Sequence, residues 1–317
     1  LEDQKIVLRQ IVEQAGKECP DAIVIAGDIY DKAIPSVEAV GVFDQFVRSL
    51  RRTVPDAVIM MISGNHDSAP RVNLYRNILE EQKIYMVGMP PQRPEEQIEK
   101  VTLQDAWGNV NFYLLPFVKP SMVKTVVGTG ENGNLLSYQE SLRRMMEREQ
   151  IREEERNVCV SHQFYLPVGT GAEQVQRMDS EICTVGNIDQ VSAEILKQFD
   201  YSALGHIHKS MKVGGDRIRY CGTPMQYSVS EAGQKKAILM VELKEKGTYS
   251  VTPIPLNAPH EVRIIKGKLN EILKLECEDY VSVLLTDRMD LDICDMQDRL
   301  YTAFPNLLEI RRERWDR

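Results

Sequence analysis

“AVIMMISGNHDS”, residues 57–68, is the stretch of sequence that decides the fold. Its first six residues are apolar, and a serine, a glycine, an amide, an imidazole and a carboxylate follow at once. A short apolar run that ends in a glycine turn is typical of a buried strand. In α/β sheets, the carboxyl ends of the strands carry loops whose polar groups bind ligands above a rigid floor. The stretch therefore predicts a buried strand with a polar site at its end.

The sequence around this strand alternates between helical and strand patterns. Apolar residues recur with the helical period in 1–18 and 35–52, and short β-branched runs fill 21–28 and 84–88. Such a βαβα alternation indicates a largely parallel sheet with helices outside it. From residue 99 onward, strands and turns become more frequent. The pattern predicts an α/β fold whose core is a sandwich of two sheets flanked by helices.

A Pro-rich joint, “PIPLNAPH” (253–260), precedes a second change of pattern. Beyond it, strand and helix patterns alternate in the order βαβαβ. We therefore expect two domains, 1–256 and 257–317, the second being a small α/β domain.

The composition bounds the class of protein. With 43% hydrophobic and 27% charged residues, it is typical of a soluble globular chain. No apolar run is long enough for a transmembrane helix, and no secretory signal is visible. None of the six cysteines forms a CxxC pair, so we expect reduced thiols, no membrane and a cytoplasmic location. The net charge of −8 argues mildly against a dedicated nucleic-acid binder, although bound divalent cations reverse the local sign.

Side chains that suit a metal ion recur at the ends of the predicted strands. Four of the five histidines occur in “SGNHD”, “VSHQF” and “LGHIH”, and an aspartate ends “IAGD”; the fifth, His260, lies in the joint and is expected at the surface. Taken singly, a Gly-Asp pair is usually a turn, and a strand-end histidine is usually structural. Together, carboxylate, amide and imidazole groups at one sheet edge suit a divalent ion such as Mn, Fe or Zn. The candidate ligands are Asp28, Asn65, His162, His206 and His208.

The order of these motifs, GD, GNHD, H and then GHxH, resembles the calcineurin-like metallophosphoesterases. Three further segments resemble the SbcD family, the nuclease subunits of bacterial SbcCD complexes: the opening “LEDQKIVLRQIVE”, “LPFVKP” (115–120) and “GTPMQYSVSEAGQKK” (222–236). The resemblance covers nearly the whole chain. It implies a metallophosphoesterase β-sandwich flanked by helices, with residues 257–317 as a DNA-binding cap domain.

The resemblance also implies a role for each candidate residue. Two divalent ions, expected to be Mn²⁺, would be held as follows: Asp28 bridges both ions, Asn65, His162 and His206 bind one, and His208 binds the other. His66 would stabilise the leaving oxygen as an acid or as a positive charge. Asp67 would orient His66, as carboxylates commonly do for functional imidazoles.

One departure from the family pattern concerns the second metal position. The family begins with a D-x-H motif on its first strand, and no D-x-H occurs in this sequence. The sequence opens at Leu1, not at a methionine. We therefore expect that the natural N-terminal segment and the first strand of the sheet precede Leu1. One metal position is then nearly complete and the other lacks most of its ligands.

The resemblance implies a metal-dependent DNA nuclease that acts in DNA repair, recombination and replication. It would be an exonuclease on duplex ends and an endonuclease on single strands and hairpins, with DNA, the SbcC ATPase and a second copy of the chain as partners. Helices at 2–18 and 36–53 are candidates for the homodimer contact. Two other functions stay open: a phosphoesterase that acts on nucleotides or phosphoproteins, and a catalytically incomplete scaffold that binds DNA ends or the ATPase.

Basic residues beside the motifs are weaker candidates for DNA contacts. Lys119, Lys209 and Arg71 flank the motifs and would reach backbone phosphates, although solvated surface charge explains each of them as well. The basic segment “RRERWDR” (311–317) would either reach DNA or lead toward the ATPase.

Overall fold

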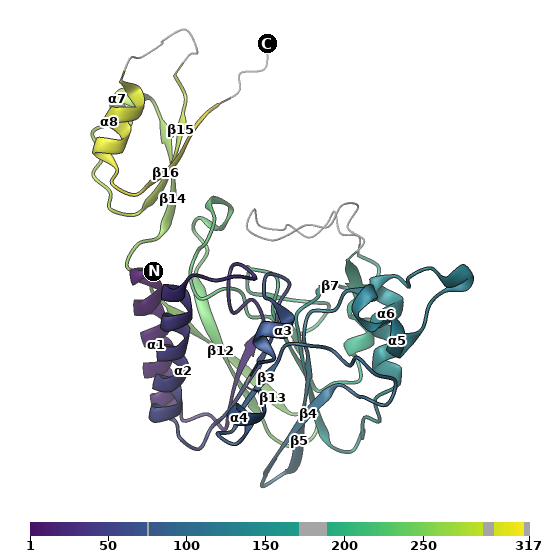
Figure 1. Ribbon diagram of the computed structural model, residues 1–317. Coiled ribbons are helices and arrows are strands. Elements are labelled where there is room, and N and C mark those ends of the chain that lie inside the picture. Colours follow the sequence, from purple (N-terminus) through teal and green to yellow (C-terminus); the bar gives the residue numbers. More distant parts are fainter. Residues whose placement is uncertain (75, 171–188, 288–294, 314–317) are drawn as a thin grey trace.

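The computed structural model describes residues 1–74, 76–170, 189–287 and 295–313 (Figure 1). Its helices are α1 (Glu2–Glu18), α2 (Val37–Thr53), α3 (Ala69–Val72), α4 (Arg76–Glu80), α5 (Pro120–Val127), α6 (Tyr138–Glu147), α7 (Leu269–Ile272) and α8 (Met296–Ala303), with short 3₁₀ turns at η1 (Glu131–Gly133), η4 (Ala193–Leu196) and η5 (Val229–Glu231). None of the helices in these ranges combines the length and the apolar composition that crossing a bilayer requires.

A three-stranded parallel sheet carries the stretch that decides the fold. Its order is β1 (Ala22–Ala26), β2 (Val58–Ile62) and β3 (Ile84–Val87). The strand β2 is buried along its whole length because both of its faces are covered. Ile59 and Met61 pack toward α1 and α2, and Met60 and Ile62 pack toward the second sheet. The helix α2 begins as expected at Ser36, whose Oγ accepts a hydrogen bond from Ala39 N at 3.2 Å.

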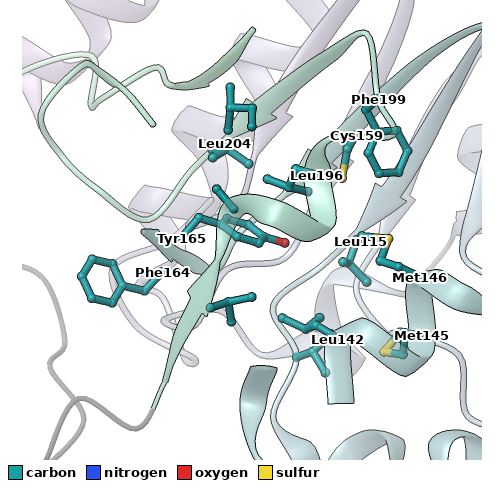
Figure 2. Close-up of a cluster of buried hydrophobic side chains, with 14 of the residues drawn as sticks. Leu115, Leu142, Met145, Met146, Cys159, Phe164, Tyr165, Leu196, Phe199 and Leu204 are labelled. Atoms are coloured by element: carbon teal, nitrogen blue, oxygen red, sulfur yellow. The ribbon is translucent and has the colours of Figure 1, made fainter. Parts of the chain in front are cut away.

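The second sheet is mixed and has six strands. Their order is β10 (Met211–Lys212), β11 (Ile218–Tyr220), β9 (Tyr201–Leu204), β6 (Arg156–Ser161), β5 (Gly108–Leu115) and β4 (Glu99–Asp105). One face meets the first sheet, and α5 and α6 cover the other face. Figure 2 shows part of the core under these helices, where Leu142 and Met145 of α6 lie near Leu115 of β5. The layers run helix, sheet, sheet, helix, so the predicted sandwich flanked by helices is confirmed.

Two smaller sheets complete the main body. The antiparallel pair β12 (Lys236–Leu243) and β13 (Tyr249–Leu256) packs Val241 and Val251 against the core between the two large sheets. The short parallel pair β7 (Phe164–Leu166) and β8 (Gln190–Ser192) lies beside α6.

The C-terminal residues form a parallel sheet with a core of its own. Its strands are β14 (Val262–Gly267), β15 (Tyr280–Leu285) and β16 (Leu307–Arg312), in that order. The helices α7 and α8 bury Leu269, Leu300 and Phe304 against it. In Figure 1 this unit extends from the main body near the start of α1. His260 Nδ1 lies 2.9 Å from Asp3 Oδ2 of α1, so the fifth histidine joins the unit to the main body.

Candidate metal centre

The two large sheets bring their carboxyl ends to the same place. Asp28 lies just beyond β1, Asn65 just beyond β2 and His162 just beyond β6. His162 Nε2 lies 3.0 Å from Asp28 Oδ2 and 3.0 Å from Asn65 Oδ1. His206, two residues beyond β9, places its Nδ1 2.9 Å from the same amide oxygen. Four of the five candidate ligands therefore meet, although each follows a different strand and they lie far apart in the sequence.

The spacing of these four side chains suits a divalent ion. Ligand atoms at about 2.1 Å from a metal and at right angles to one another stand about 3 Å apart. The three separations between these donor atoms are 2.9 to 3.0 Å. Within the described ranges no group of three or more His, Cys, Asp and Glu side chains forms a ready metal cluster, so the set depends on the amide oxygen of Asn65.

The orientation of His162 points its second nitrogen at this set. His162 is almost completely buried, and its Nδ1 lies 2.6 Å from the carbonyl oxygen of Ala26. A carbonyl oxygen only accepts, so Nδ1 carries the hydrogen and Nε2 faces Asp28 and Asn65. A lone pair directed at two oxygen atoms is unfavourable unless a proton or a metal ion stands between them. The arrangement therefore fits a bound cation.

The electrostatics of the pair lead to the same conclusion. Burial raises the pKa of Asp28, but the charge and the hydrogen bond of His162 outweigh burial and hold that pKa well below its usual value. Burial lowers the pKa of His162, and the Asp28 charge outweighs it, so the net shift is upward. The buried edge of the two sheets thus favours a positive charge beside Asp28.

The backbone at the strand ends is shaped for this convergence. Asp28 has a φ of 48° and His206 a φ of 95°, values that side-chain-bearing residues seldom adopt. Such strain is typical of functional sites. A Cβ added to Gly64 would stand 2.0 Å from Asp28 Oδ1, and one added to Gly205 would stand 1.8 Å from Ala26 O. The sequence signal for these glycines is their position directly before the ligands in “GNHD” and “GHIH”.

Asp67 has a different set of contacts from the one expected. Its Oδ2 accepts from Ile29 N at 3.0 Å and from Gly64 N at 2.8 Å, and its Oδ1 accepts from Tyr30 N at 2.9 Å. These bonds tie the turn after β1 to the turn after β2. Asp67 therefore positions the backbone that carries Asp28; the expectation that it orients the imidazole of the neighbouring histidine is wrong.

His66 is instead oriented by a backbone group. Its Nδ1 lies 2.9 Å from the carbonyl oxygen of Asp31, and its side chain is 16% exposed. Its backbone N donates to Asp28 Oδ1 at 3.0 Å. His66 and Asp28 both line a cleft with a volume of about 2220 Å³ that runs along β1 and β12. The imidazole thus stands at the border between the four-residue set and the open cleft.

His208 lies beside a carboxylate that sequence reasoning missed. Its Nδ1 lies 3.0 Å from Glu231 Oε1, and the Glu231 side chain is fully buried. The segment 222–236 served only as a family marker, because nothing in the sequence pairs Glu231 with a histidine 23 residues away. His208 lines the same cleft as His66.

The candidate DNA-contacting residues are exposed. Lys119 precedes α5, Arg71 lies in α3 and Lys209 follows the “GHIH” motif. Their positions beside the strand ends leave them available for contacts with a ligand.

Comparison with known proteins agrees with the resemblance seen in the motifs. The profile of the calcineurin-like phosphoesterase family matches residues 2–210. A Staphylococcus epidermidis protein, named as the SbcD component of the nuclease SbcCD, is 30% identical over 318 residues, which cover 98% of this chain and 79% of that protein. The resemblance to SbcD is therefore confirmed along almost the whole chain. The chain belongs to the calcineurin-like phosphoesterase family.

Proposed function

We propose that this chain is the nuclease subunit of an SbcCD-type complex and hydrolyses DNA phosphodiesters with divalent metal ions. The observation that carries the proposal is the meeting of Asp28, Asn65, His162 and His206 at one sheet edge, with donor atoms 2.9 to 3.0 Å apart. The similarity to a protein named as part of a nuclease supports DNA as the substrate. Exonuclease action on duplex ends and endonuclease action on single strands and hairpins are the proposed activities.

Two divalent ions, Mn²⁺ by proposal, are the cofactors. Asp28, Asn65, His162 and His206 would hold one ion, and Asp28 and His208 would contribute to the other. When bound, such ions polarise a phosphoryl oxygen and make water a strong nucleophile near neutral pH. Asp28 is suited to this task because His162 keeps its pKa low, so the carboxylate stays ionised.

His66 is proposed to act on the leaving oxygen. Asp31 O can only accept, so Nδ1 of His66 carries a hydrogen in every charge state. The ring therefore gives or takes its functional proton at Nε2. A protonated Nε2 donates a hydrogen bond to the oxygen that departs from phosphorus and neutralises its negative charge.

DNA and protein partners are proposed from position and similarity. The unit of residues 257–317 is proposed as a DNA-binding cap; Gln226 Oε1, which accepts from Val262 N, holds it beside the segment that contains Glu231. Lys119, Lys209 and Arg71 are proposed to contact backbone phosphates. The name of the relative supports an SbcC partner. A homodimer through α1 and α2 is also proposed; Val37 and Val40 of α2 expose apolar surface.

A catalytically incomplete scaffold is the second candidate. It is favoured by the lack of a D-x-H motif in the sequence and by the ligand set around His208, where the ring nitrogen contacts Glu231. A scaffold would bind DNA ends or the ATPase without cleaving them.

The test compares substrates with the full-length gene product, stripped of metal and supplied with Mn²⁺ or Mg²⁺. Linear duplex, hairpin DNA, cyclic nucleotides and a phosphopeptide are offered in parallel. We expect cleavage of linear and hairpin DNA that a chelator abolishes and Mn²⁺ restores. Turnover of nucleotides or phosphopeptide in preference to DNA would support another phosphoesterase. DNA binding with no cleavage of any substrate would support the scaffold.

A further inference from the structure

The fully buried carboxylate of Glu231 has partners on both of its oxygens. Oε1 lies 3.0 Å from His208 Nδ1 and accepts from Ser228 Oγ at 3.1 Å. Oε2 accepts from Lys236 Nζ at 2.6 Å and from Thr223 Oγ1 at 3.2 Å. A buried charge with such a set of donors is held in one orientation.

Lys236 holds the same histidine at its backbone. Its side chain is 7% exposed, and its Nζ donates to the carbonyl oxygen of His208 at 3.0 Å and to Thr223 Oγ1 at 2.8 Å. Thr223 N also donates to that carbonyl at 3.1 Å. One segment, residues 222–236, therefore fixes both the ring and the main chain of His208.

This arrangement decides which nitrogen of His208 carries its hydrogen. A carboxylate only accepts hydrogen bonds, so Nδ1 must donate to Glu231. In the neutral ring, Nε2 then carries the lone pair.

We propose that Glu231 is a positioning residue that fixes this tautomer of His208 and makes Nε2 its metal-binding nitrogen, with Lys236 as the counter-charge that keeps the carboxylate in place. The metal-binding part rests on the proposed function; the tautomer does not. Nothing in the segment touches the reacting atoms, so its effect passes through His208.

The counter-charge makes the proposal sharp. In Glu231→Gln the side chain keeps its shape, but one oxygen becomes an NH₂ donor. Lys236 can only donate and is charged, so the remaining oxygen turns to Lys236 and the NH₂ group faces His208 Nδ1. Nδ1 must then accept, the ring hydrogen moves to Nε2, and the lone pair for a metal is lost.

A second substitution reverses this effect. In the double variant Glu231→Gln with Lys236→Met, the charged donor is absent, so the amide oxygen turns back to His208 Nδ1. The double variant also removes both buried charges together, which protects the fold. The control is Glu242→Gln, the same chemical change on the exposed side of β12.

The experiment reads the ring nitrogens of His208 by ¹⁵N NMR of metal-free protein, at a pH where imidazoles are neutral. We expect the lone pair on Nε2 in the unaltered chain, in Glu242→Gln and in the double variant, and on Nδ1 in Glu231→Gln. A lone pair that stays on Nε2 in Glu231→Gln overturns the proposal, as does a double variant that fails to restore it.

Mn²⁺ titration of the full-length gene product separates this proposal from the proposed function. Glu231→Gln should weaken Mn²⁺ binding by roughly 10- to 100-fold, and the double variant should recover most of that loss. Unchanged Mn²⁺ affinity together with the expected tautomers overturns His208 as a metal ligand and leaves the positioning by Glu231 established.

Discussion

Replacing Gly64 with alanine should disable the metal centre without touching a ligand. The added Cβ would stand 2.0 Å from Asp28 Oδ1 and 2.3 Å from Asp28 N, whereas ordinary contact begins at 3.4 Å. The methyl group and the carboxylate must therefore move apart by about 1.4 Å, and the clash with a backbone atom forces the two turns apart as well. Because the donor atoms are spaced for a single ion, such a shift should weaken metal binding by roughly 10- to 100-fold.

The assay is calorimetric Mn²⁺ titration, with chemical unfolding measured in parallel. Overpacking should also cost about 1 to 3 kcal/mol of the free energy of unfolding. The matched control is Gly41→Ala in α2, where an added Cβ meets nothing within 4 Å; removing a glycine from a helix should stabilise the chain by about 0.5 to 1 kcal/mol. Wild-type Mn²⁺ affinity in Gly64→Ala would refute the close approach of these two turns.

Three further predictions follow from the site and the core. His66→Ala should retain Mn²⁺ and DNA binding but lose about 10²- to 10⁴-fold in cleavage rate, and an equal loss of Mn²⁺ affinity would show that His66 is a ligand. Mn²⁺ affinity should fall as pH falls through the raised pKa of His162, because a proton then occupies the Nε2 that must bind the ion; calorimetry in buffers of different ionisation enthalpy should detect proton release, and pH-independent affinity would contradict this. Leu114→Ala, at a fully buried position between the two sheets, should cost about 2 to 5 kcal/mol in denaturant unfolding, and a smaller loss would show that this interface can collapse around the cavity.

The positions of the candidate ligands could be predicted because strand ends are local features. The run before Asn65 is buried on both faces, and parallel strands place their carboxyl ends along one edge. Asp28 and Asn65 follow neighbouring strands of one sheet, so sequence pattern alone brings them together.

The contacts of Asp67 and His208 could not be predicted in the same way. They depend on how loops of irregular backbone cross the sheet edge, and no periodicity describes such paths. Asp67 follows His66 in the sequence, yet its carboxylate reaches the turn after β1, because two backbone N–H groups in that turn need acceptors outside a strand. Glu231 lies in a 3₁₀ turn, and only the folded chain brings it to His208.

The most direct test of the account is to locate manganese in crystals of the full-length gene product by anomalous scattering at its absorption edge. The account predicts a peak within about 2.0 to 2.3 Å of Asp28, Asn65, His162 and His206. A well-occupied peak elsewhere, or none at this sheet edge when the protein cleaves DNA, would contradict it.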